Sequence, residues 1–195
     1  MTHIKSALEI ALAKTDSIKS DKLALSAAEG REEGKKLASA FFQNSEMDLA
    51  KELKNLPEEK LSAAKEGFFQ IVFANIVLPR DEKDIKILDP IAKALGILTG
   101  KTSQVDTLKN QLAQFFAQWL GDKKQLEEAI WQKLGPMMKQ KEEQVSRQMG
   151  RQVKIDPKSD PDYMKAYNAN IGNLESQYGS ALAQAKEDLA AMMKE

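Results

Sequence analysis

The sequence predicts an all-α protein, a multi-helix bundle with a long C-terminal antiparallel helical hairpin and no β-sheet. Strong helix formers, chiefly Ala, Leu, Lys, Glu and Gln, dominate the 195 residues. Apolar residues recur at spacings of three and four, which places them on one face of a helix. No segment shows the strict alternation of apolar and polar residues between turn residues that is typical of a half-buried strand.

Residues 1–44 predict two helices. The first covers residues 2–17, and its apolar face carries Ile4, Leu8, Ala11, Leu12 and Thr15. Asp21 can cap the second, which should end near Asn44. Gly30 and Gly34 lie in the middle of the second helix, where a glycine costs about 1 kcal/mol relative to alanine. They indicate either close packing of a neighbouring helix, which we favour, or a local break.

Residues 45–100 predict a short helix at 45–54, a core helix and a segment interrupted by proline. Pro57 suits the first position of the core helix, which should continue to Leu78 and has apolar residues on more than one face. A segment capped by Asp81 follows. Pro90 should kink or split that segment after residue 89, and Gly100 should end it.

Residues 102–152 predict two further helices. The first opens at Thr102 or Ser103 and should stop at Gly121. The second should extend to residue 152, with a kink at the Gly-Pro pair 135–136. Its last part, residues 139–152, is polar on almost all sides, so we expect this end to project from the core.

The final helix has the clearest periodicity. A turn-rich stretch precedes it, Asp160 suits its cap and Pro161 its first position. Its apolar residues alternate spacings of three and four, as in a heptad seam. We interpret this seam as a candidate interaction surface: Met164, Tyr167, Ile171, Leu174, Tyr178, Leu182, Leu189 and Met192.

The seam must be buried against something. We favour a partner within the chain, which gives an antiparallel hairpin of residues 122–152 against 161–194. A seam between two chains is the alternative. The corresponding domain organisation is an N-terminal helical bundle at 1–121 and a hairpin at 122–195 that packs on it or projects from it, or else one continuous domain.

Composition excludes several classes of function. The 29 basic and 29 acidic residues balance, which argues against the basic surface of a nucleic-acid-binding protein. The absence of Cys excludes a disulfide framework and favours a reducing compartment, so we expect a cytoplasmic protein. No apolar run reaches the length of about 18 residues that a membrane-spanning helix needs.

The motifs that resemble catalytic or ligand-binding sites do not fit their templates. Residues 96–102 end in Gly-Lys-Thr like a phosphate-binding P-loop, but three residues separate their two glycines where the motif requires four. Asp156, Asp160 and Asp162 could surround a cation, yet prolines intervene and capping explains the same residues. The one histidine, His3, cannot supply a di-metal bundle or a catalytic triad of the usual kind. We therefore predict no catalytic, cofactor-binding or metal-binding residue, and no enzymatic activity.

Two surfaces could bind a partner. Residues 133–158 carry seven basic side chains against three acids, which we interpret as a solvated, projecting hairpin rather than a nucleic-acid or lipid site. Aromatic residues on several helices suggest, as an alternative function, a pocket for a small apolar or amphipathic ligand. These residues are Phe68, Phe69, Phe73, Phe115, Phe116, Trp119 and Trp131.

The N-terminal segment resembles a family of uncharacterised bacterial all-helical proteins. The resemblance rests on the opening Ile-Lys-Ser-Ala-Leu-Glu at residues 4–9, on Asp21-Lys22 and on Gly-Lys-Lys-Leu-Ala at 34–38, within about the first 45 residues. It implies a bacterial source and no particular chemistry. The heptad seam, the polar hairpin and the missing chemical groups together favour a non-enzymatic interaction or assembly protein, with a protein partner or a second copy of the chain.

Overall fold

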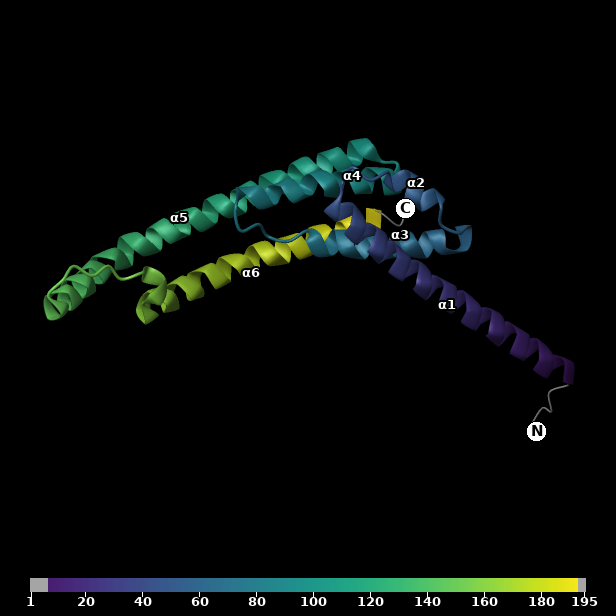
Figure 1. Ribbon diagram of the computed structural model, residues 1–195, viewed down its shortest axis with the longest axis horizontal. Coiled ribbons are helices and arrows are strands. Elements are labelled where there is room, and N and C mark those ends of the chain that lie inside the picture. Colours follow the sequence, from purple (N-terminus) through teal and green to yellow (C-terminus); the bar gives the residue numbers. More distant parts are fainter. Residues whose placement is uncertain (1–6, 193–195) are drawn as a thin grey trace. The chain divides into compact units, whose positions relative to one another are not determined.

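The computed structural model describes the backbone of residues 7–192 and the side chains of residues 21–191 (Figure 1). These residues form six α-helices and two short 3₁₀ segments, and no strand occurs among them, which confirms the all-α prediction. The α-helices are α1 (Ala7–Gln43), α2 (Leu49–Lys54), α3 (Glu58–Asn75), α4 (Leu88–Thr99), α5 (Thr102–Met149) and α6 (Pro161–Met192). The 3₁₀ segments are η1 (Glu82–Ile87) and η2 (Pro157–Ser159).

The chain divides into two compact units. The first comprises Met1–Ile76 and Ile87–Asp106, and the second comprises Val77–Lys86 and Thr107–Glu195. Helix α5 begins in the first unit, and most of its length lies in the second. The helix end expected at Gly121 is absent, because α5 is one helix of 48 residues. A single glycine in a helix costs only about 1 kcal/mol, which the packing of the residues around it offsets.

Helix α1 is also longer than the sequence predicted. It runs without interruption from Ala7 to Gln43, so the two helices expected at 2–17 and 21–44 are one, and Asp21 is not a cap. The residues between the two expected helices, 17–21, include neither proline nor glycine and allow the helix to continue. Residues 2–6 of the expected first helix lie outside the described part of the chain.

Helices α1 and α3 approach each other very closely through glycines. A Cβ atom added to Gly34 would lie 1.8 Å from the carbonyl oxygen of Ala64, and one added to Gly67 would lie 2.0 Å from that of Arg31. The backbones therefore touch where a larger residue would hold them apart. This confirms the close-packing interpretation of Gly30 and Gly34, and α1 shows no break at either position.

The apolar core of the first unit is centred on α3. Phe68 and Val72 are fully buried, as predicted for the core helix, and the Phe68 ring lies 6.1 Å from that of Phe41 on α1. Helix α3 ends at Asn75 instead of Leu78. The Asn75 side chain donates a hydrogen bond to the carbonyl of Ile71, and the next residue is extended.

The proline and glycine signals around α4 are confirmed in part. Pro90 lies in the first turn of α4, where a missing N–H is tolerated, so the segment splits before Leu88 into η1 and α4. Gly100 ends α4 in the left-handed conformation at φ 72°, and its N–H donates to the carbonyl of Gly96. Thr102 opens α5 as expected.

The second unit contains the predicted antiparallel hairpin, formed by α5 and α6. Moving along α5 toward its C-terminus, Phe115, Trp131 and Lys141 contact residues successively nearer the N-terminus of α6, namely Tyr178, Tyr163 and Asp160. Helix α5 continues through Pro136 without interruption. Over the described residues, no helix is long and apolar enough to cross a membrane.

The candidate functional site at the end of the hairpin

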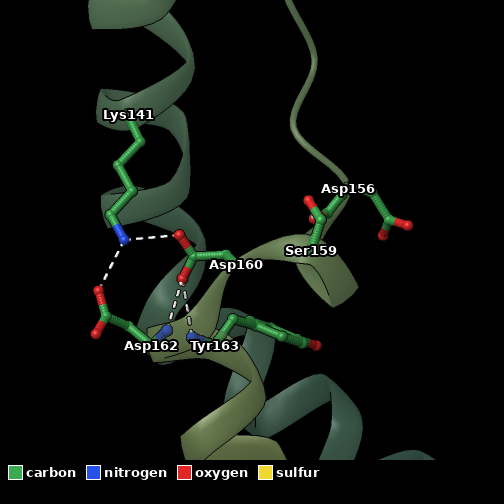
Figure 2. A network of polar contacts seen from close by, with 6 residues as sticks. All are labelled: Lys141, Asp156, Ser159, Asp160, Asp162 and Tyr163. Atoms are coloured by element: carbon green, nitrogen blue, oxygen red, sulfur yellow. Dashed lines mark hydrogen bonds and ion pairs between the residues drawn. The ribbon is translucent and has the colours of Figure 1, made fainter.

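A polar network closes the hairpin where α6 begins (Figure 2). The ammonium group of Lys141 on α5 lies 2.7 Å from a carboxylate oxygen of Asp160 and 2.8 Å from one of Asp162. The other carboxylate oxygen of Asp160 accepts hydrogen bonds from the backbone N–H groups of Asp162 and Tyr163. Asp160 therefore caps α6, as the sequence predicted, and also fixes α6 to α5.

Asp160 is buried, and its charge is stabilised by its neighbours. The hydrogen bond from Lys141 lowers the pKa of Asp160, with a further contribution from the N–H of Tyr163, and both outweigh the opposing effect of burial. The two carboxylates in turn raise the pKa of Lys141. Both groups are thus held in their charged forms at neutral pH, and the network is a structural clamp.

The segment that connects the two helices is tied to the last turns of α5. The Ser146 hydroxyl accepts a hydrogen bond from the N–H of Val153 at 2.8 Å, and a Glu142 carboxylate oxygen accepts one from the N–H of Ile155 at 2.9 Å. Asp156 accepts a hydrogen bond from the N–H of Lys158 and begins η2. The connection is therefore ordered by side chains of α5 although it has little regular structure.

An open groove of about 500 Å³ lies between the end of α5 and this connecting segment. All but one of the residues that line it have polar or charged side chains: Lys139, Glu142, Glu143, Ser146, Arg147, Gln152, Val153 and Lys154. Glu142 and Ser146 hold the connecting segment, while Arg147 lies 3.9 Å from Glu143 in an exposed ion pair. Such an exposed pair contributes little to stability, so Arg147 can change partners.

Most basic residues of the hairpin end, which comprises residues 133–158, have no acidic partner in the part of the chain that the structure describes. Lys141 is held by the clamp, and Arg147 has its loose contact with Glu143. The other five are exposed and form no ion pair with any residue that the structure describes: Lys133, Lys139, Arg151, Lys154 and Lys158. The fold thus leaves these five cations exposed and outside any ion pair with a described residue.

The heptad seam of α6 lies against α5 over its central part. Tyr167 donates a hydrogen bond to Glu127 at 3.0 Å, and Tyr178 donates one to Asp122. Burial, reinforced by these hydrogen bonds, raises the pKa of each tyrosine to about 12. Ile171, Leu182 and Leu189 are buried, Met164 and Leu174 are half-buried, and the side chain of Met192 lies outside the described part of the chain.

The seven aromatic residues of the alternative pocket fall into both units. Phe68, Phe69 and Phe73 belong to the first, where the Phe69 and Phe73 rings stack on each other. The others belong to the second unit: Phe115, Phe116, Trp119 and Trp131. Phe115 and Trp119 pack on Tyr178, the Trp119 N–H donates to the carbonyl of Pro79, and the half-exposed Trp131 contacts Tyr163.

Comparison with known proteins assigns a family. A family model with the description "Family of unknown function (DUF6657)" matches residues 50–191, well over half of the chain. The chain belongs to this family. No curated protein and no solved structure matches it.

The match confirms that the chain belongs to a family of unknown function. It starts after the first 45 residues, which carry the N-terminal resemblance, and it includes the whole hairpin end. The DUF6657 match therefore covers the clamp, the groove and the five exposed basic residues of the hairpin end. The bacterial source stays a prediction.

Sequence reasoning identified the basic stretch and the Asp160 cap but missed the contacts between them. Lys141 was one of several basic residues on a polar helix, and nothing in its neighbours distinguished it. The partner acids follow 19 and 21 residues later, on the far side of a turn-rich segment. Opposite charges that flank the turn of a predicted hairpin are the signal that could have identified the clamp. No cluster of metal-binding side chains occurs among the described residues, and His3 lies outside them.

Proposed function

We propose that this protein is a non-enzymatic cytoplasmic interaction protein that binds a protein partner through the end of its α5–α6 hairpin. One observation carries the proposal: the hairpin end is held in a defined conformation, and yet five of its basic residues have no acidic partner among the described residues. A surface with fixed geometry and unneutralised charge is suited to recognising a partner of complementary charge.

Side-chain contacts join the two helices of the hairpin along its length. Asp122 with Tyr178, Glu127 with Tyr167 and the Lys141 clamp link α5 to α6 at three levels. Between the second and third levels, an apolar cluster is built on Ile130, Met138 and Tyr163. The part of α5 in the second unit is roughly 65 Å long at 1.5 Å per residue. The basic residues of α5 at the hairpin end lie toward the C-terminus of this length.

The composition supports a binding role over catalysis. The chain has one histidine and no cysteine, which leaves few of the side chains on which nucleophilic or metal-dependent catalysis usually depends. The absence of cysteine is also what favours the reducing environment of the cytoplasm. The alternative, a pocket for a small apolar ligand, has less support because several of its aromatic rings pack on one another.

The test is site-specific photo-crosslinking in cells of the source organism. A photoreactive amino acid would replace the exposed Gln140, Gln144 or Gln148 of the hairpin end, and the exposed Ala50 or Gln70 of the first unit as controls. We expect one protein to form a covalent adduct with the hairpin positions and not with the controls. Light scattering then distinguishes a second copy of the chain from a different protein.

The proposal would be wrong if the hairpin positions formed no adduct, or if Ala50 and Gln70 captured the same protein with equal yield. The adduct must also depend on the site itself. Binding of the purified partner should therefore weaken when charges of the hairpin end are reversed, while the far-ultraviolet circular dichroism spectrum stays unchanged.

A further inference from the structure

We infer that the groove at the hairpin end binds an extended acidic segment of a protein partner. This inference rests on the proposed function and adds the chemistry of the ligand. The groove has a volume of about 500 Å³, which is enough for a few residues of a peptide and too small for a folded surface. The bound segment would then be a short stretch of chain with carboxylates at intervals.

The charge around the groove is the first argument. Lys139 and Arg147 line the side formed by α5, and Lys154 lines the opposite side. Among the described residues, the one ion pair of Arg147 is its 3.9 Å contact with Glu143. Arg151 is exposed beside the same connecting segment. Cations on both sides of a groove can each meet a different carboxylate of a segment that lies along it.

The backbone of the connecting segment is the second argument. Alternate N–H groups, those of Val153 and Ile155, donate to side chains of α5. These two hydrogen bonds fix the connecting segment, and with it Lys154, in a defined position across the groove from Lys139.

The same residues disfavour the other polyanions. Glu142 and Glu143 also line the groove, and they would repel the closely spaced phosphates of a nucleic acid, whereas a peptide can place its carboxylates away from them. No aromatic side chain lines the groove to stack on a base. Val153 is its one apolar lining residue, which is too little for insertion into a lipid surface.

The experiment measures binding of defined probes to the full-length protein by fluorescence anisotropy. The probe is a short labelled peptide that alternates Glu and Thr, with a Gln-Thr peptide as the neutral control. The variant carries Lys139→Glu, Arg147→Glu and Lys154→Glu. Its matched control carries Lys22→Glu, Lys54→Glu and Lys83→Glu, which reverse the same number of charges at exposed positions elsewhere.

We expect the wild-type protein to bind the Glu-Thr peptide and not the Gln-Thr peptide, with affinity that falls as salt is added. The groove variant should bind at least about tenfold more weakly, while the matched control stays within about twofold of the wild type. In NMR spectra, the peptide should shift the resonances of Val153 and Lys154, which line the groove.

Equal weakening in both triple variants would overturn the inference, because binding would then follow net charge and not the groove. Tighter binding of oligothymidine, or of phosphatidylcholine vesicles that contain phosphatidylserine, would overturn it in favour of a phosphate ligand. If the peptide fails while the hairpin crosslinks persist in cells, the acidic chemistry is wrong and the proposed function stands. If the peptide binds and no crosslink forms, the groove stands and the proposed function is wrong.

Discussion

The substitution Gly34→Ala tests the close contact between α1 and α3. The added Cβ atom would lie 1.8 Å from the carbonyl oxygen of Ala64, whereas an ordinary contact begins at about 3.4 Å. The obstacle is backbone and cannot rotate away. The two helices would have to separate by roughly 1.5 Å, and even a gap of about 1 Å forfeits up to half of the attraction between facing atoms.

The magnitude follows from two opposing effects. Overpacking of this kind costs typically about 1–3 kcal/mol, and a backbone obstacle places Gly34 at the upper end of that range. Alanine is the better helix former and offsets about 1 kcal/mol. We therefore expect Gly34→Ala to lower the free energy of unfolding by about 2 kcal/mol.

The assay is denaturant unfolding followed by far-ultraviolet circular dichroism, which reports on all the helices. Trp119 and Trp131 both lie in the second unit, so tryptophan fluorescence does not report directly on the contact at Gly34. Gly121→Ala is the matched control, because no heavy atom lies within 4 Å of the added Cβ and Gly121 is inside a helix. It should stabilise the protein by about 1 kcal/mol. A Gly34→Ala protein as stable as the wild type would refute the reasoning.

Three further predictions concern the second unit. The pair of Asp160 with Lys141 lowers the native pKa of Asp160, so the stability from this pair is present above the ordinary pKa of 3.8 and is lost as pH falls through the native pKa. Asp160→Asn should therefore make the melting temperature depend less on pH in the acidic range. The pKa of Tyr178 is raised to about 12, so the stability that its hydrogen bond contributes is present below pH 10 and is lost as pH rises through 12. Tyr178→Phe should remove one late-titrating tyrosine from an ultraviolet absorbance titration. Trp119→Ala should lower the free energy of unfolding by about 3–5 kcal/mol in denaturant unfolding, because the side chain is buried and donates a hydrogen bond to the carbonyl of Pro79. Trp131 is 44% exposed, so Trp131→Ala should lower it by only about 1 kcal/mol. Similar losses in the two variants would contradict this difference in burial.

Local signals in the sequence predicted the ends of several helices well. Gly100 has no Cβ, which makes it suited to the left-handed turn that ends α4. Asp160 and Pro161 mark the start of α6, because a short carboxylate can accept from free N–H groups and proline needs no donor there. These features depend on a few neighbouring residues and on no distant contact.

The same local reasoning divided α1 and α5 where the structure does not. Asp21 and Gly121 are residue types that often occur at helix ends, but each also fits inside a helix at a cost of about 1 kcal/mol or less. Packing decides such cases. For α5 the distant contacts include the hydrogen bond from Tyr178 to Asp122, which joins residues 56 positions apart and holds the residue after Gly121 against α6.

The side-chain contacts of the candidate site were beyond prediction for a related reason. The clamp forms only if the register of the hairpin places Lys141 opposite the start of α6. A shift of one residue would turn the ammonium group about 100° around the helix and away from Asp160. The heptad pattern predicts which face of α6 is buried, but it leaves the register of the partner helix undetermined.

The polar pairs also bear on whether the seam of α6 is an assembly surface. A heptad seam alone fits a contact within one chain or between two chains equally well. Tyr167 and Tyr178, however, are half-buried and donate hydrogen bonds to carboxylates on α5 of the same chain. An assembly through this seam would have to break both hydrogen bonds and leave the tyrosines and carboxylates half-buried without partners, at about 1–3 kcal/mol for each orphaned group. The surface of the hairpin that is free to bind without such a cost is its charged end, which is why the proposed binding site lies there and not along the seam.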